Sequence, residues 1–60
     1  MSIGGSNRLL SVPETAEYLS VPERTLRDNY RRWQLPSYKV GRALRFRVRD
    51  LEDWIAQQRN

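Results

Sequence analysis

The sequence predicts one small α+β domain in which two helices, a β-hairpin and a third helix follow one another. Three observations predict this order. Pro13 and Pro22 each stand at the start of a stretch with apolar residues at helical spacing, which separates two short helices. Apolar and basic residues then alternate around Gly41, as in a two-stranded hairpin. The last segment returns to helical spacing.

Size and composition exclude several classes of protein. A chain of 60 residues forms one domain that buries only about 60% of its unfolded surface, which leaves no room for a deep substrate cavity. There is no cysteine for a disulfide or a thiolate zinc site, and no histidine, the commonest general base and metal ligand. We therefore expect a protein that is not an enzyme and has no catalytic residue, cofactor or metal.

The start of the chain gives no sign of a targeting segment. MSIGGSN lacks an apolar run of signal-peptide length, and nowhere do about 20 apolar residues follow one another. These features predict a cytoplasmic protein with no membrane partner. MSIGGSN is uncharged and rich in glycine and serine, so residues 1–8 are expected to be a disordered tail and residues 9–58 the folded domain.

The first elements are a short strand and a helix. RLLSV is too short to stand alone, but it suits an edge strand that leads into the helix PETAEYLS. Pro13 and Glu14 both favour a first helical turn. The residues expected to face the core are Val12, Ala16 and Leu19, whereas Glu14 and Glu17 are expected to face water.

A second proline ends this helix and begins another. Pro22 lies three residues past Leu19, and VPERTLRDNYRRW follows as a second helix. Two helices joined by about three residues form a helix-turn-helix unit. On a helical wheel the second helix has an apolar face and a basic face roughly opposite: Leu26, Tyr30 and Trp33 against Arg24, Arg27 and Arg31.

The hairpin and the last helix follow. SYKV and ALRFR alternate with period two around Gly41 and Arg42, a pair that suits a type II′ turn, with a longer loop through Ala43 as the alternative. The residues expected to face inward are Tyr38, Val40, Leu44 and Phe46, and those expected to face outward are Lys39, Arg45 and Arg47. In DLEDWIAQQRN the inward positions of a final helix are Leu51, Trp54, Ile55 and Gln58.

The positive charge is concentrated in the middle of the chain. Residues 23–49 carry nine basic side chains against Glu23 and Asp28, a net charge of +7 within a chain whose total is +4. Ten of the eleven basic residues are arginine, whose planar fork pairs with phosphate and with guanine. This pattern favours a polyanion as partner, and a solvated basic face without a dedicated ligand is the alternative.

The basic face of the second helix suits the major groove of DNA. Arg24 and Arg27 are the candidates for bidentate contact with guanine, a contact worth about 1–3 kcal/mol of discrimination. Glu23 suits acceptance from cytosine N4, Asp28 suits orientation of a neighbouring arginine or the same acceptance, and Thr25 suits a phosphate or a thymine methyl group. The phosphate candidates farther along are Arg31 and Arg32. Glu23 and Arg27 also form an i, i+4 pair that needs no DNA.

The hairpin is a second basic element. Gly41 and Arg42 form its tip, and glycine there lets the backbone approach a ligand closely. Lys39, Arg45 and Arg47 point outward in the predicted phase and suit the minor groove or the phosphates. A row of charges that protects a short sheet edge from aggregation is the alternative.

Four segments resemble a known family: LLSVPETAEYLSVPERTL, LP, VGRALRF and DLEDWI. Over residues 9–57 the chain is similar to the MerR-related excisionases, small winged helix-turn-helix proteins of phages and integrative elements. The resemblance implies a MerR-like fold with a recognition helix over residues 23–31 and a wing over residues 41–45. Two positions depart from the family pattern. Asn29 replaces an apolar residue and suits a partner surface or a buried hydrogen bond, and Trp33 replaces a glycine, so that Gln34 or a tighter turn takes the strained conformation.

The same resemblance implies a non-catalytic function. Excisionases bind adjacent DNA sites cooperatively, bend the DNA and direct an integrase, a tyrosine or serine recombinase, toward excision. This implies a protein that is monomeric in solution and self-associates on double-stranded DNA, associated with the bacterial nucleoid. Two alternatives stay open at this point: a small transcriptional regulator of the same fold, and a basic protein-interaction module.

Overall fold

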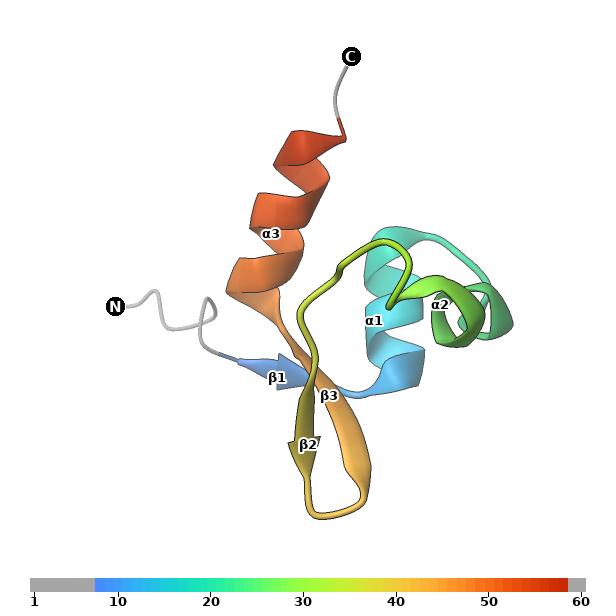
Figure 1. The fold of residues 1–60 in the computed structure, drawn as a ribbon, viewed down its shortest axis with the longest axis vertical. Helices are drawn as coiled ribbons and strands as arrows, with labels where there is room; N and C mark the ends of the chain where they lie inside the picture. The colour runs from blue at the N-terminus through green and yellow to red at the C-terminus, as the bar shows by residue number, and fades with distance from the viewer. Residues whose placement is uncertain (1–7, 59–60) are drawn as a thin grey trace.

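The computed structural model describes residues 8–58, which form three helices and a small antiparallel sheet (Figure 1). The predicted tail, residues 1–8, lies outside the described residues except for Arg8, whose carbonyl accepts a hydrogen bond from the Val48 N–H at 2.9 Å. The elements are β1 (Leu9–Leu10), α1 (Val12–Leu19), α2 (Glu23–Asn29), β2 (Tyr38–Val40), β3 (Ala43–Arg47) and α3 (Val48–Gln57). The predicted order of elements is confirmed.

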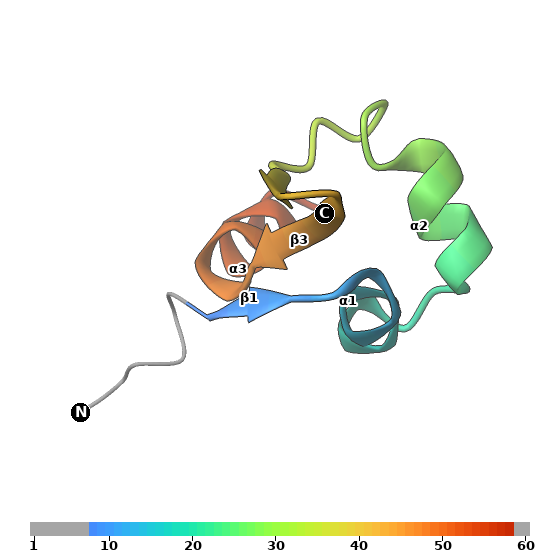
Figure 2. The same cartoon turned by 90° about the horizontal axis from the view of Figure 1, so that it is seen from below.

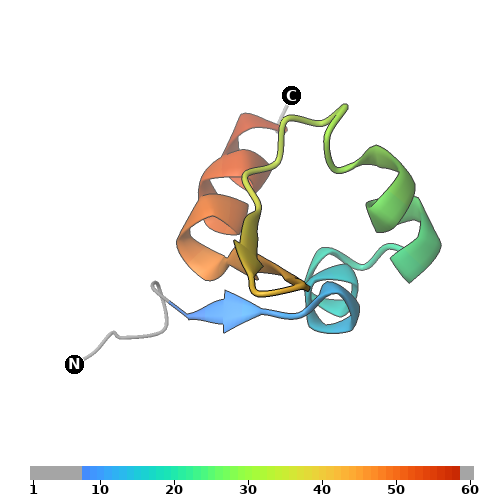
Figure 3. The same cartoon turned by 60° about the horizontal axis from the view of Figure 1, so that its bottom comes forward.

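The sheet has the order β1-β3-β2, with both neighbours antiparallel to the central strand. Leu10 pairs with Phe46 in one half, and Tyr38 pairs with Arg45 in the other. RLLSV thus contributes an edge strand, as predicted. The β2–β3 hairpin projects away from the helices (Figure 1), and in Figure 3 it lies between α3 on one side and α1 with α2 on the other.

The predicted phase of strand β2 is wrong. Tyr38 and Val40 were expected to face inward, but both are exposed, Val40 by 56%. The turn contains two residues, so Val40 pairs with Ala43 and Lys39 pairs with Leu44. Directly paired residues share a face of the sheet. Lys39 therefore lies on the face of Leu44 and Phe46, and Tyr38 and Val40 lie on the opposite face.

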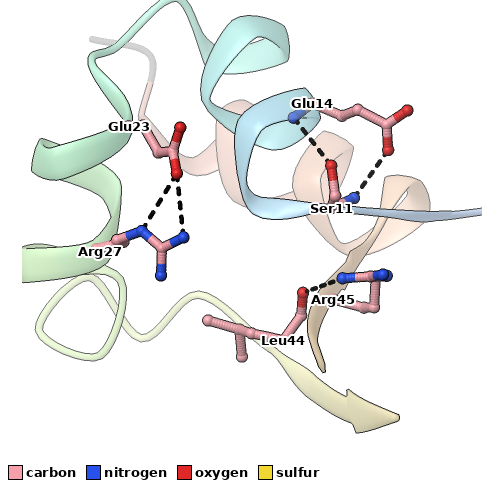
Figure 4. Close-up of polar contacts among 6 residues, drawn as sticks. All are labelled: Ser11, Glu14, Glu23, Arg27, Leu44 and Arg45. Atoms are coloured by element: carbon pink, nitrogen blue, oxygen red, sulfur yellow. Dashed lines mark hydrogen bonds and ion pairs between the residues drawn. The ribbon is translucent and has the colours of Figure 1, made fainter. Parts of the chain in front are cut away.

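Helix α1 begins with a capping box. The Ser11 hydroxyl accepts a hydrogen bond from the Glu14 N–H at 3.3 Å, and the Glu14 carboxylate accepts one from the Ser11 N–H at 2.9 Å (Figure 4). The bond from the Ser11 backbone, followed by that to its side chain, holds the pKa of Glu14 below its ordinary value of 4.5. Ser20, with a φ of 60°, ends the helix in the left-handed conformation. Two of the three predicted core residues, Val12 and Ala16, are buried.

Helix α2 is shorter than the segment predicted for it. It starts after Pro22 and ends at Asn29, and its side chain Leu26 is fully buried. The turn after the helix is closed by Gln34, which has a left-handed φ of 60°. The N–H groups of Gln34 and Leu35 donate to the carbonyls of Arg31 and Tyr30 at 3.0 Å each. These two bonds form a Schellman motif, in which Gln34 takes the position usual for glycine.

Helix α3 starts at Val48, two residues before the predicted start. Leu51 is fully buried, and Trp54 stacks on Trp33 with 5.4 Å between ring centres and donates its indole N–H to the Trp33 carbonyl at 3.1 Å. Two predicted inward positions are wrong, because Ile55 is 42% exposed and Gln58 is exposed as well. Trp54 packs on Trp33 in the turn before β2, and this contact sets the orientation of α3. Ile55 is therefore left on the solvent side.

A single apolar core joins the elements. Its buried members are Leu10, Val12, Ala16, Leu26, Leu35, Phe46 and Leu51. The Phe46 ring meets the Tyr30 ring edge to face at 5.6 Å, which links the central strand to the end of α2. The core therefore fixes α2 and the turn after it relative to the hairpin, and these segments carry most of the arginine side chains.

Thr15 is a buried polar residue whose replacement by valine is expected to stabilise the fold. Its side chain is fully buried in α1, and its hydroxyl has no hydrogen-bond partner among residues 8–58. Valine has nearly the same shape without the desolvated hydroxyl, so Thr15→Val should raise the free energy of unfolding by about 1 kcal/mol. Urea unfolding followed by circular dichroism measures this. Thr15→Ser is the control: it keeps the hydroxyl, loses a methyl group and should destabilise. A lower urea midpoint for Thr15→Val would contradict the explanation.

Candidate nucleic-acid interface

The α2 surface carries charged residues of both signs. Arg24, Arg27 and Asp28 are exposed, as is Glu23 at the start of the helix. Thr25 is half-buried, and its carbonyl accepts a hydrogen bond from the Asn29 side-chain amide at 2.8 Å. Of the two interpretations left open for Asn29, the structure favours the hydrogen bond, since this partly buried contact closes the last turn of the helix.

Glu23 and Arg27 form the tightest ion pair of the helix. Both the Nε and the Nη2 groups of Arg27 donate to the same Glu23 oxygen, Oε2, at 3.3 and 3.0 Å (Figure 4). The i, i+4 pair anticipated from the sequence is thus present without DNA. It leaves the end of the guanidinium that carries Nη1 outside the contact.

Arg24 and Asp28 are related by the same spacing but are held more loosely. The Arg24 Nε lies 4.0 Å from the Asp28 Oδ2, beyond hydrogen-bond distance, and the Arg24 side chain is 93% exposed. An exposed pair of this kind contributes little to stability. The Arg24 side chain is therefore free to move to a ligand.

Arg31 and Arg32 lie beyond the end of α2, in the turn closed by Gln34. Both are exposed, and the Arg31 guanidinium carbon lies 5.8 Å from the centre of the Tyr30 ring. A cation over an aromatic face keeps its charge available at its outer side. Their place after the helix suits contact with the DNA backbone.

The hairpin tip consists of Gly41 and Arg42, both exposed. Gly41 has a φ of 65°, and Arg42 is not among the described residues with positive φ, which agrees with the predicted type II′ turn. A Cβ at Gly41 would meet nothing within 4 Å, so the positive φ, and not crowding, favours glycine here. Lys39 is exposed on the outer strand, next to the tip.

The two arginines on β3 differ from the tip in having partners within the fold. Arg45 is half-buried and donates from Nη1 to the Leu44 carbonyl at 2.9 Å (Figure 4). Arg47 pairs with Asp50 at 3.3 Å and places its guanidinium 5.2 Å from the centre of the Tyr38 ring. Arg47 thus serves the fold, whereas Arg42 at the tip is directed to solvent.

Tyr38 and Asp50 are the residues of this region that sequence reasoning missed. The Tyr38 hydroxyl donates to the Asp50 carboxylate at 2.7 Å, and this bond raises the pKa of Tyr38 above its ordinary value of 10.0. The same carboxylate oxygen accepts from Arg47, so the three side chains fasten the base of the hairpin to α3. The sequence did contain a signal for this contact. A two-residue turn pairs Tyr38 with Arg45, which places Tyr38 on the face of Arg45 and Arg47.

Outside the basic surface, the described residues form a pocket beside α3, lined by Gln34, Pro36, Asp50, Asp53, Trp54 and Gln57. Within residues 8–58 no group of three or more aspartate, glutamate, histidine or cysteine side chains is arranged to hold a metal ion. Each helix of that part of the chain is also too short or too polar to cross a bilayer.

These elements define the class of the protein. Helices α1 and α2 are joined by a short turn and followed by a projecting antiparallel hairpin, so they form a helix-turn-helix with a wing. Figure 2 shows α2 and α3 at opposite ends, with β3 and α1 between them. A family model described as a helix-turn-helix domain matches residues 9–59. The chain belongs to this family, which includes excisionase-like DNA-binding proteins, and membership supports DNA as the partner. Comparison with curated proteins and with solved structures gives no significant match.

Proposed function

We propose that the chain is a sequence-specific, non-catalytic architectural protein of the excisionase type. The observation that carries the proposal is the placement of two arginine-bearing surfaces on one helix-turn-helix scaffold: α2 with the turn that follows it, and the hairpin tip. In this function α2 enters the major groove, and the wing around Gly41 and Arg42 contacts the adjacent minor groove or backbone, as in the MerR-like winged fold.

The small size of the domain favours binding in tandem. Single modules of this size bury only about 600–1,000 Å² on DNA, so one copy binds weakly and several adjacent copies gain affinity together. Cooperative binding by molecules that are monomeric in solution would bend the attachment-site DNA and present it to an integrase. The proposed place of action is the nucleoid in the host cytoplasm.

An excision assay tests this proposal. The purified protein is added to the integrase and attachment-site DNA of the element that encodes it, and excised product is measured with nuclease footprints taken in parallel. We expect excision to depend on the protein, and the footprint to cover several adjacent sites and to extend when integrase is present. A footprint confined to a promoter, with no effect on excision, would refute the excisionase function and identify a transcriptional regulator. A protein that binds acidic polypeptides but no duplex DNA would instead be an interaction module.

A further inference from the structure

We propose that Glu23 is the positioning residue that sets Arg27 to read a base, and that Arg24 contacts phosphate. This inference rests on the proposed DNA-binding function and divides the roles of two arginines that the sequence places on the same face. The division follows from the different ways in which the two i, i+4 pairs of α2 are made.

Arg27 is already hydrogen-bonded to Glu23 before any ligand arrives. A guanidinium has five N–H donors, and Glu23 Oε2 takes one from Nε and one from Nη2. The three donors that remain lie on Nη1 and on the far side of Nη2, at the end of the fork. End-on bidentate contact with guanine O6 and N7 uses one donor from each of these nitrogens. Glu23 therefore supports Arg27 from behind and leaves free the edge that recognises guanine.

This support lowers the entropic cost of recognition. An arginine side chain loses rotamer freedom when it is fixed at an interface, and a side chain already fixed in the free protein loses less. A change of rotamer toward a misplaced base is disfavoured, because it breaks two hydrogen bonds to the Glu23 carboxylate. The pair thus favours one base position over its alternatives.

Glu23 also penalises binding at the wrong sequence. Its carboxylate is partly exposed, with 44% of the side chain accessible, and it repels DNA phosphates at any site. Only where Arg27 meets its base is this repulsion offset. Specificity increases when an interface contains an element that disfavours wrong partners.

Arg24 has neither the hydrogen bonds nor the partial burial that Arg27 has. Its contact with Asp28 is a single 4.0 Å approach without a hydrogen bond, and its side chain is almost fully exposed. A mobile cation of this kind suits a phosphate, which offers a broad target and carries no sequence information. Asp28 is therefore the matched control for Glu23: it has the same charge, lies on the same helix and pairs with an arginine at the same spacing.

The test begins with a duplex selected by the wild-type protein from a randomised pool. Affinities for this duplex, for a scrambled duplex and for single base-pair variants are measured for Glu23→Ala, Asp28→Ala, Arg24→Ala and Arg27→Ala. We expect Glu23→Ala to lose about tenfold in the ratio of selected to scrambled affinity, with the loss at the base pair where Arg27→Ala also loses its preference. Asp28→Ala should bind both duplexes slightly more tightly at an unchanged ratio, and Arg24→Ala should bind both more weakly at an unchanged ratio.

Two further variants separate positioning from a general effect on folding. The double variant Glu23→Ala/Arg27→Ala should lose no more discrimination than Arg27→Ala alone, because the two residues act as one unit. Glu23→Gln keeps an acceptor oxygen and should retain more discrimination than Glu23→Ala. A change in folding alone would lower both affinities together and leave the ratio unchanged, which would overturn the assignment.

The result also separates this inference from the function on which it depends. A wild-type protein that selects no duplex would overturn the DNA-binding function and the assignment with it. A wild-type protein that selects a duplex, together with a Glu23→Ala variant that keeps the full ratio, would overturn only the role of Glu23. A loss of discrimination in Arg24→Ala at one base pair would show that the roles of the two arginines are reversed.

Discussion

Replacing Phe46 with alanine is expected to remove about a third or more of the free energy of unfolding at 25 °C. Phe46 is fully buried on the central strand, pairs with Leu10 across the sheet and meets the Tyr30 ring edge to face. Removing a buried phenylalanine side chain costs about 3–5 kcal/mol. A domain of this length has a total stability of only about 3–9 kcal/mol, at 0.05–0.15 kcal/mol per residue. The loss is therefore a large fraction of the whole free energy of unfolding.

Far-ultraviolet circular dichroism and urea unfolding measure this effect, and the stacked Trp33–Trp54 pair offers a fluorescence signal for the packing of α3. Phe46→Leu fills much of the same space and should leave a folded protein of reduced stability. Val40→Ala, in the same hairpin but at an exposed position, should change stability by no more than about 0.5 kcal/mol. An unfolding midpoint of Phe46→Ala equal to that of the wild type would show that the core described above does not hold the fold together.

The elements that could be predicted from the sequence are those set by local chemistry. Pro13 and Pro22 each favour a helix start, and the resulting order of helices and strands agrees with the structure. For the turn after α2 the family resemblance left two possibilities, Gln34 or a tighter turn, because Trp33 occupies a position usual for glycine, and the structure shows Gln34 with a φ of 60°. Gln34 takes the strained conformation one residue later, where two backbone hydrogen bonds hold it.

The wrong predictions concern which face of a strand or helix points to the core, and this depends on how the elements pack against one another. The alternation of β2 was assigned from hydrophobicity alone, and a short strand with one free edge does not need to bury its apolar residues. The two-residue turn reverses the phase, so that Tyr38 reaches Asp50 and not the core. Ile55 is similar: its spacing fits an inward position, but the docking of Trp54 on Trp33 rotates it outward.

The candidate site shows the same division. The positions of the basic residues are visible in the sequence, but the partners of each are not. Arg45 and Arg47 looked equivalent on one strand, yet Arg47 is bound to Asp50 and stacked on Tyr38. Arg24 and Arg27 also looked equivalent, but their pairs differ in distance, 4.0 against 3.0 Å, and in the exposure of the arginine, 93% against 57%. Such differences arise from tertiary packing and rotamers, which a helical wheel does not contain.

The second large expected effect is that of salt. Raising the salt concentration from 50 to 200 mM should weaken binding to duplex DNA about a thousandfold. Each basic group that neutralises a phosphate releases counterions, so log K falls linearly with log salt, with a slope of about −0.9 per contact. On α2, the turn after it and the hairpin, the basic groups counted for phosphate, without Arg27 and Arg47, are Arg24, Arg31, Arg32, Lys39, Arg42 and Arg45. Six contacts give a slope of about −5. Fluorescence anisotropy of a labelled duplex across the salt series measures it.

Two substitutions in one hairpin then separate the wing from bystander charge. Arg42→Ala removes an exposed cation at the tip, so it should weaken binding to every sequence and make the slope shallower by about 1. Arg47→Ala removes the same charge from a side chain that the fold already uses, so the slope should stay at its wild-type value when the variant is folded. Both variants keep Gly41 and hence the turn. If Arg42→Ala leaves the slope unchanged while Arg47→Ala makes it shallower, the base of the hairpin, and not its tip, meets the DNA backbone.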